Sequence, residues 1–276
     1  MFKKILIFGF VCILTLCLLA GWKRQTEPYV YFASPYQRID IASLAEKAAL
    51  EEDEYRILFS QTGLSRRAIE TIPSERSKDI LLYAQEAFFS APRITCGKSG
   101  IVSWEEQNEG DCLPDFIGLE EGDILLSFCC HTFGWRNGHA AIVINAEEGT
   151  TLEAVMIGED ACLQNVRKWR YYPSFLVLRL KGQPLEVRKK IARYAYDTME
   201  GVPYGFSADL LEHFGLGEKI RNTDCSHLIW KVYKEFGFDL DSDGGFFVTP
   251  QDIAESSLLE VIQVYGIDFS KIHENS

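Results

Sequence analysis

The feature that most restricts the fold of this chain is a cysteine at the start of an amphipathic helix. Cys225 follows Asn222-Thr223-Asp224, and apolar residues then recur at helical spacing until Gly237, a residue typical of a helix end. Earlier in the chain, His139 opens the apolar run 139–144, which is typical of a buried strand. A fold that packs this helix on this strand would bring a thiol and an imidazole together. That pair is the usual nucleophile and base of cysteine hydrolases.

The N-terminus predicts export. Met1-Phe2-Lys3-Lys4 is basic, and an uncharged apolar run of sixteen residues extends from Ile5 to Ala20. Three alternatives fit residues 1–21: a cleaved signal peptide, an uncleaved membrane anchor, or a lipid anchor at Cys17. Each alternative places the rest of the protein outside the cytoplasm, secreted or tethered to the outer face of the cytoplasmic membrane. Membrane contact is expected only through this segment.

The net charge argues against one class of binding partner, and the sequence pattern suggests how the chain is divided into domains. The chain has 276 residues and a net charge of −12, and an acidic surface disfavours binding to nucleic acid. We divide it into residues 1–21, a helical N-terminal region over 22–110, and a catalytic domain over 111–276. Helices are expected at 39–59 and 78–89, followed by a long loop or small subdomain at 90–116.

The second half predicts an α+β fold, with an antiparallel sheet packed on the cysteine-bearing helix. Strands clustered before helices favour this class over a doubly wound sheet. The expected strands are 122–128, 139–145, 151–157, 175–180 and 259–265, and the expected helices are 184–199, 224–236 and a short one beginning near Thr249.

A third polar residue is expected behind the histidine. Glu153 lies in Thr151-Leu152-Glu153-Ala154, on the strand after the one that carries His139. If the hairpin turns near residue 146 or 147, Glu153 lies opposite His139 or one diagonal step away, on the same face of the sheet. A carboxylate there fixes the ring tautomer and stabilises the imidazolium. The alternative is an exposed strand glutamate.

The remaining cysteines and acidic residues do not predict a metal or cofactor. The sequence has eight cysteines, and the best disulfide candidate is Cys96 with Cys112, which flank a loop-like segment. Zinc binding by 129–131 is disfavoured, because adjacent strand residues point to opposite faces. The acidic stretch 239–244 copies the first half of a calcium loop, but Pro250 falls where the bidentate glutamate is required. We interpret it as an acidic turn.

Several short segments together resemble one family. They are Glu-Gly-Asp-Ile-Leu-Leu (121–126), Gly-His-Ala-Ala-Ile-Val (138–143), Leu-Glu-Ala-Val (152–155), Val-Pro-Tyr-Gly-Phe (202–206), Thr-Asp-Cys-Ser-His-Leu-Ile-Trp (223–230) and Thr-Pro-Gln-Asp-Ile-Ala-Glu-Ser (249–256). In this order they resemble the circularly permuted papain-fold amidases of the YiiX/YaeF type, relatives of the NlpC-type cell-wall peptidases. The resemblance covers about residues 117–266 and rests on the set of segments and their order.

The resemblance implies roles for individual residues. Cys225 would be the nucleophile, His139 the base and Glu153 the third member of the triad. Tyr204 would have a substrate or oxyanion role, although a packing role fits the sequence equally well. Asp224 and Ser226 match positions linked to binding of a substrate amine.

The expected function is therefore that of an exported cysteine amidase or peptidase working through an acyl-enzyme, on peptide-like amides such as cell-wall peptides. One alternative is a lipid acyltransferase or thioesterase, because lecithin retinol acyltransferase-like proteins share the permuted fold. Trp135 and Trp169 would then line an acyl groove, unless they belong to the core. A third alternative is a binding module of the same fold without turnover.

Overall fold

The structure is a computed structural model that describes Val11, Thr15 and residues 31–109, 112–132, 134–206 and 222–268. The predicted export segment lies outside these residues, apart from Val11 and Thr15. In the part of the chain that is described, no helix has both the length and the apolar character needed to cross a bilayer.

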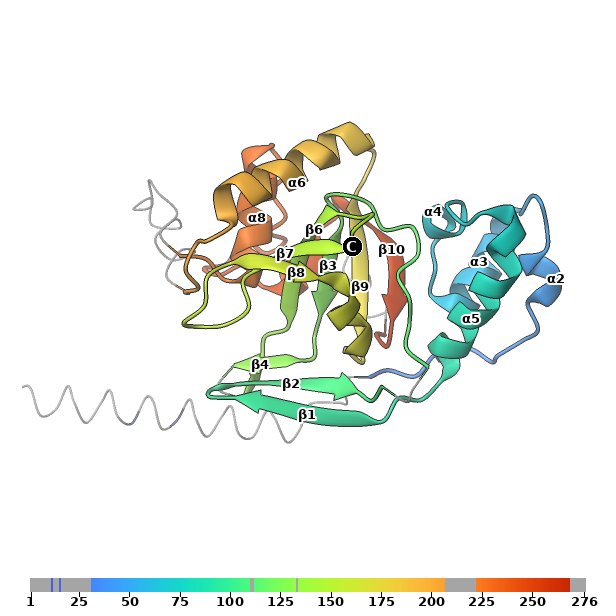
Figure 1. The fold of residues 1–276 in the computed structure, drawn as a ribbon, viewed down its shortest axis with the longest axis horizontal. Coiled ribbons are helices and arrows are strands. Elements are labelled where there is room, and N and C mark those ends of the chain that lie inside the picture. The colour runs from blue at the N-terminus through green and yellow to red at the C-terminus, as the bar shows by residue number, and fades with distance from the viewer. Residues whose placement is uncertain are drawn as a thin grey trace, which may run out of the picture.

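The main sheet has six antiparallel strands in the order β10-β9-β3-β6-β7-β8 (Figure 1). Its members are β3 (Ile124–Ser127), β6 (His139–Asn145), β7 (Thr150–Glu153), β8 (Cys162–Asn165), β9 (Phe175–Leu180) and β10 (Leu259–Tyr265). The fold is thus α+β with antiparallel sheets, as the sequence predicts.

Helices cover both faces of this sheet. On one face, α6 (Leu185–Met199), α8 (Cys225–Glu235) and α9 (Pro250–Glu255) share a core with the side chains of Ile124 and Ile142. On the other face, residues of the N-terminal helices share a second core with Leu125 and Val143. Neighbouring strand residues point to opposite faces, so a strand that is apolar at every position can serve both cores.

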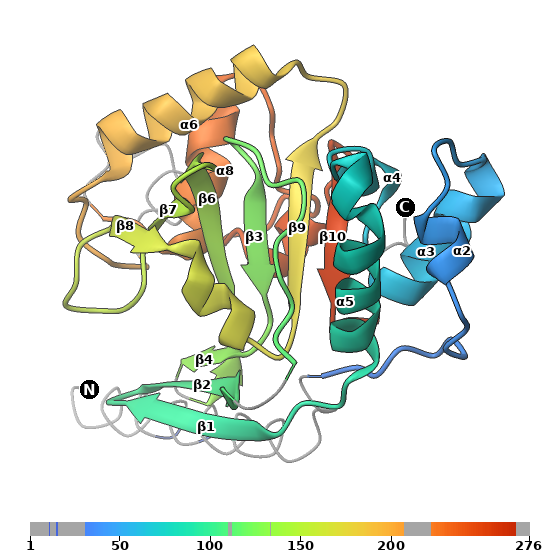
Figure 2. The ribbon, with the colours of Figure 1, turned by 45° about the vertical axis from the view of Figure 1, so that its right-hand side comes forward.

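The N-terminal region is helical but more broken than the sequence predicts. Its helices are α2 (Ala42–Ala45), α3 (Glu52–Thr62), α4 (Arg66–Ile69) and α5 (Ser77–Phe89), and Figure 2 shows them at the β10 end of the sheet. The single helix expected over 39–59 is wrong. Glu51 and Glu54 form a capping box, and this reciprocal pair of side chain–backbone bonds starts a new helix in the middle of the predicted one.

Residues 90–116 were expected to form a loop or subdomain, and within them β1 (Ile94–Ser99) and β2 (Val102–Gln107) form a hairpin. This hairpin pairs with β4 (Cys130–Thr132), which in turn pairs with β5 (Trp135–Arg136), giving a second sheet of four strands. The second sheet therefore joins strands from both sides of the predicted boundary at residue 110. Figures 1 and 2 show it at one end of the main sheet.

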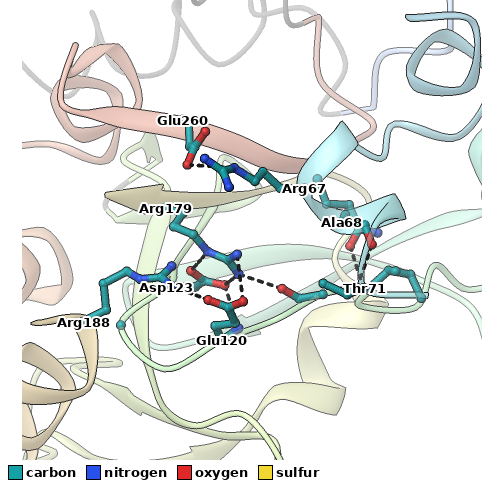
Figure 3. Close-up of polar contacts among 12 residues, drawn as sticks. Arg67, Ala68, Thr71, Glu120, Asp123, Arg179, Arg188 and Glu260 are labelled. Carbon is teal, nitrogen blue, oxygen red and sulfur yellow. Dashed lines mark hydrogen bonds and ion pairs between the residues drawn. The ribbon is translucent and has the colours of Figure 1, made fainter. Parts of the chain in front are cut away.

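A buried ionic cluster ties the turn before β3 to its neighbours (Figure 3). Arg179 of β9 donates to both carboxylate oxygens of Asp123 at 2.7 Å, and it also pairs with Glu120 at 3.2 Å. Arg188 of α6 pairs with the same Glu120. Burial raises the pKa of Asp123 to about 6, although the hydrogen bonds and charge of Arg179 oppose the rise.

The expected disulfide does not form. Cys96 lies exposed on β1 and Cys112 is half-buried, and both are free thiols in the structure. Cys129, Cys130, Cys162 and Cys225 are also free.

Candidate functional site: a thiol and an imidazole on one cavity

Cys225 is the first residue of helix α8. The side chain of Asp224 caps this helix by accepting hydrogen bonds from the backbone N–H groups of Ser226 and His227, at 3.0 and 2.9 Å. Asp224 binds the amides of Ser226 and His227, so the cap leaves the backbone N–H of Cys225 for another acceptor. The cysteine is thus held at the N-terminal end of the helix, as the sequence predicts.

His139 is the first residue of β6, and the residue before it, Gly138, lies close to the backbone of Ser127. Gly138 has φ of +73°, and a Cβ added there would lie 2.6 Å from the carbonyl oxygen of Ser127. Only glycine fits such a position without a shift of the backbone. This contact fixes where the strand begins and therefore where the imidazole leaves it.

Glu153 reaches the imidazole from the neighbouring strand, as predicted. In the β6–β7 pairing, Ile142 lies opposite Leu152 and Val143 opposite Thr151. Glu153 is therefore one diagonal step from His139 on the same face. His139 Nε2 and Glu153 Oε2 are 2.6 Å apart, and both side chains are buried.

The carboxylate of Glu153 has further partners that the sequence did not predict. Thr151 Oγ1 and Trp169 Nε1 donate to Oε1 at 2.7 and 3.0 Å, and Lys168 Nζ lies 2.8 Å from Oε2. Burial acts to raise the pKa of this carboxyl group. The hydrogen bond and charge of His139, with the charge of Lys168, outweigh burial and lower the pKa to about 2. Glu153 is therefore ionised over the whole neutral range.

Trp169 also contacts the histidine ring itself. Its indole stacks on the imidazole with the ring centroids 5.3 Å apart and an interplanar angle of 18°. Trp169 is fully buried and belongs to the second core, so the structure bears out its core alternative. Trp135, by contrast, is exposed on β5.

Cys225 and His139 line the same cavity, which has a volume of about 240 Å³. The sulfur accepts a hydrogen bond from the backbone of Ala140, the residue that follows His139. A larger cavity, of about 270 Å³, lies between α5 and β10, and the described residues that line it include none of the predicted site residues. The chemistry therefore points to the cavity at Cys225.

The thiol is neutral at rest. Cys225 is 5% exposed. Burial raises its pKa to about 12, with the Asp224 charge adding to the rise, while hydrogen bonds from Ala140 and Ser226 act in the opposite direction. The helix N-terminus favours a thiolate, but these two effects outweigh it.

Tyr204 reaches the cavity through a backbone bridge to the segment before the cysteine. Residues Tyr204 and Thr223 form a parallel bridge, in which Gly205 N–H donates to the Thr223 carbonyl at 3.0 Å. The phenol lines the cavity, and burial raises its pKa well above the usual value. The hydroxyl is therefore a neutral hydrogen-bond donor.

Asp224 and Ser226, the predicted substrate-binding pair, lie next to Cys225 but away from the cavity. Both are buried, and Ser226 Oγ donates to the capping oxygen of Asp224 at 3.1 Å. Neither is among the described residues that line the cavity. Their contacts in the structure are those of a helix cap.

One wall of the cavity comes from a region to which the sequence assigned no chemistry. Strand β2 contributes Val102, Trp104 and Glu106, and β4 contributes Cys130 and Thr132. The signal in the sequence was the alternation of apolar and polar residues along 102–106, which Gly97 and Gly100 just before it obscured.

Two metal hypotheses can be compared with the structure. In β4, Cys130 lines the cavity and His131 lies 3.7 Å from Glu105, while the sulfurs of Cys129 and Cys130 are 3.9 Å apart. Within the described residues, the acidic turn brings ligand oxygens of Asp241, Asp243 and Asp252 to within 4.8 Å of one another. Such clusters are common on acidic surfaces without an ion.

Comparison with known proteins assigns neither a family nor a function to this chain. No family model matches the chain, and no curated protein does. A crystal structure of YiiX from Escherichia coli O157:H7, described as a metalloprotein and as DUF1105, is similar to 54% of this chain, with 98% of that chain covered. The identity is 16% and the TM-score 0.43, a loose match of the two folds.

Proposed function

We propose that this protein is a cysteine hydrolase of the amidase or peptidase type, in which Cys225 is the nucleophile, His139 the base and Glu153 the residue that orients it. One observation carries the proposal. Cys225 and His139 line one cavity. Glu153 is hydrogen-bonded to Nε2 of His139, which leaves Nδ1 as the nitrogen that can act as the base. Because Nε2 is bound to Glu153, Nδ1 is the nitrogen that would receive the thiol proton.

The raised pKa of Cys225 dictates the order of events. A thiol with a pKa of about 12 is not a preformed thiolate. The proton would move to His139 Nδ1 as the sulfur attacks the carbonyl carbon of the substrate. The imidazolium, stabilised by the ionised Glu153, then returns the proton to the leaving amine, and an acyl-enzyme forms. Water, deprotonated by His139, releases the acid and restores the thiol.

Two donors are available for the oxyanion of the tetrahedral intermediate. The backbone N–H of Cys225 lies at the helix terminus outside the Asp224 cap, and the neutral hydroxyl of Tyr204 lines the same cavity. Donors fixed in place before the reaction are effective because they need no reorganisation.

The wider assignment is an exported amidase with a permuted papain-like fold, acting on a peptide-like amide such as a cell-wall peptide. The resemblance of its segments to YiiX/YaeF-type amidases, and the order of histidine strand before cysteine helix, support this. No cofactor or metal is required by the chemistry proposed, and nucleic acid is not an expected partner.

A second candidate uses the same triad on an acyl ester or thioester. The observation that favours it is the apolar character of the cavity, to which Val102, Trp104 and Met156 contribute. A binding module without turnover is the third alternative, and it predicts no covalent intermediate.

The experiment is to detect the acyl-enzyme. The full chain is mixed with peptide amides, muropeptides and p-nitrophenyl esters, and the protein is analysed by mass spectrometry at early times. We expect one acyl group on Cys225, and no acylation or turnover in Cys225→Ala. Cys162→Ala, a thiol outside the described lining of the cavity, is the matched control. Acyl transfer that persists in Cys225→Ala, or no acylation by any amide or ester, would rule the proposal out.

A further inference from the structure

We infer that the β1–β2 hairpin is the specificity element of this site, and that Trp104 forms an apolar wall that selects an apolar acyl group. This inference rests on the proposed function for its chemistry. The hairpin lies before the segments on which the family resemblance rests, so it is a property of this chain's own N-terminal region.

The strand pairing directs one face of the second sheet at the cavity. Val102 and Trp104 are two residues apart on β2, so their side chains leave on the same face. In the β2–β4 register, Val102 lies opposite Thr132 and Trp104 opposite Cys130. All four line the cavity that contains Cys225.

Trp104 is held in position by a glycine on β1. Gly97 lies opposite Trp104 in the hairpin, and a Cβ at Gly97 would come within 2.5 Å of the indole ring. The ring therefore lies flat across the glycine backbone, which is a known way of stabilising a glycine in a sheet. The position of the wall is thus set by a residue that is not itself part of the described lining.

The chemistry of the lining defines the occupant. Val155, Met156, Tyr172 and Tyr204 add apolar surface to that of Val102 and Trp104. Because Cys225 lines this cavity, the part of the substrate that stays on the sulfur in the acyl-enzyme would contact its lining. An apolar acyl chain fits it, whether the leaving group is an amine or an alcohol.

The first test is binding, which needs no turnover. Octanamide and butanamide are titrated by calorimetry into the full chain carrying Cys225→Ala. We expect octanamide to bind roughly two-hundredfold more tightly than butanamide, since its four additional methylenes each contribute about fourfold when buried. Trp104→Ala should remove most of this difference, while Trp135→Ala, in the same sheet, should leave it unchanged. Equal affinity for the two amides, or no effect of Trp104→Ala, would overturn the inference.

The second test moves the wall without removing it. Gly97→Ala should push the indole and shorten the preferred chain, measured as kcat/KM for p-nitrophenyl esters from acetate to dodecanoate. Lys98→Ala, an exposed neighbour on the same strand, is the control. A chain-length profile identical to that of the unmodified protein would contradict the inference.

The two tests separate this inference from the proposed function. Selective binding of octanamide without any acyl-enzyme on Cys225 would refute the proposed function and leave the wall in place. An acyl-enzyme that forms equally fast with all chain lengths would leave the proposed function in place and refute the wall.

Discussion

The indole of Trp169 stacks on the imidazole of His139 and, through its N–H, also binds the carboxylate that holds the same imidazole. One side chain thus fixes the plane of the histidine ring and one oxygen of its partner. In the proposed mechanism, Trp169 would position His139 without touching the substrate.

Trp169→Phe should separate these two roles. The substitution keeps a stacked ring but removes the hydrogen bond at 3.0 Å to Glu153. We expect kcat to fall about tenfold, because loss of one hydrogen bond to a charged group corresponds to about 1.5 kcal/mol or more. The pH profile of kcat/KM should also shift, since the environment of the base changes. A fall in thermal stability with an unchanged pH profile would indicate a packing role alone.

The ionised Glu153 should stabilise the folded protein by an amount that decreases as the solution becomes acidic. Its pKa is about 2 in the folded state, below the ordinary value of 4.5. A lowered pKa contributes stability that is present above pH 4.5 and is lost as the pH falls towards 2. The difference in unfolding free energy between the unmodified protein and Glu153→Gln should therefore shrink by about 3 kcal/mol over that window. Urea unfolding at several pH values measures it, and a difference independent of pH would contradict the assignment.

The contribution of Asp123 to the free energy of unfolding should change with pH in the opposite direction. Its pKa of about 6 lies above the ordinary 3.8, so the folded state binds the proton more tightly than the unfolded state does. Its contribution to stability is greatest at low pH and declines by about 3 kcal/mol as the pH rises from about 4 to about 6. The unfolding free energy measured relative to Asp123→Asn should follow this decline. A difference that grows with pH would show that pairing with Arg179 outweighs burial.

Asp224→Asn should make the nucleophile more reactive. Asparagine caps a helix as well as aspartate does, so α8 should keep its stability. The substitution removes a charge that raises the pKa of Cys225, and the thiolate fraction at neutral pH should increase. Alkylation of Cys225 by iodoacetamide, followed by peptide mass spectrometry, should therefore be faster.

The same variant tests the predicted role of Asp224 in binding a substrate amine. A rise in KM for amine-bearing substrates would support a role of the Asp224 charge in substrate binding, because the cap is retained in this variant. Asp239→Asn provides the control, because Asp239 lies beyond the other end of α8 and binds Trp230.

The sequence predicted those parts of the site that depend on local pattern. The helix start at Cys225, the strand at His139 and the position of Glu153 near His139 each follow from spacing within a short segment. The helix break at Glu51 was missed because the apolar period continues across it, while the capping side chains decide the boundary.

The wall of the cavity was missed for a different reason. Strand β1 is largely exposed and contains Gly97, so it shows no apolar alternation. Its place is decided by pairing of β2 with β4, a contact between residues distant in sequence. The stacking of Trp169 on His139 is also a contact between separate elements, which a local sequence pattern does not predict. Its helical turn, Val166–Tyr171, follows β8, a strand that the sequence did not predict.

The pairing of β2 with β4 across the predicted boundary at residue 110 has a practical consequence for tests of the proposed activity. A fragment starting at residue 111 would retain the nucleophile, the base and its carboxylate. It would lack Val102 and Trp104, so the thiol would face solvent and β4 would be left as an open edge, prone to pairing with other chains. Enzymatic tests of such a fragment would report on an unselective, aggregation-prone molecule.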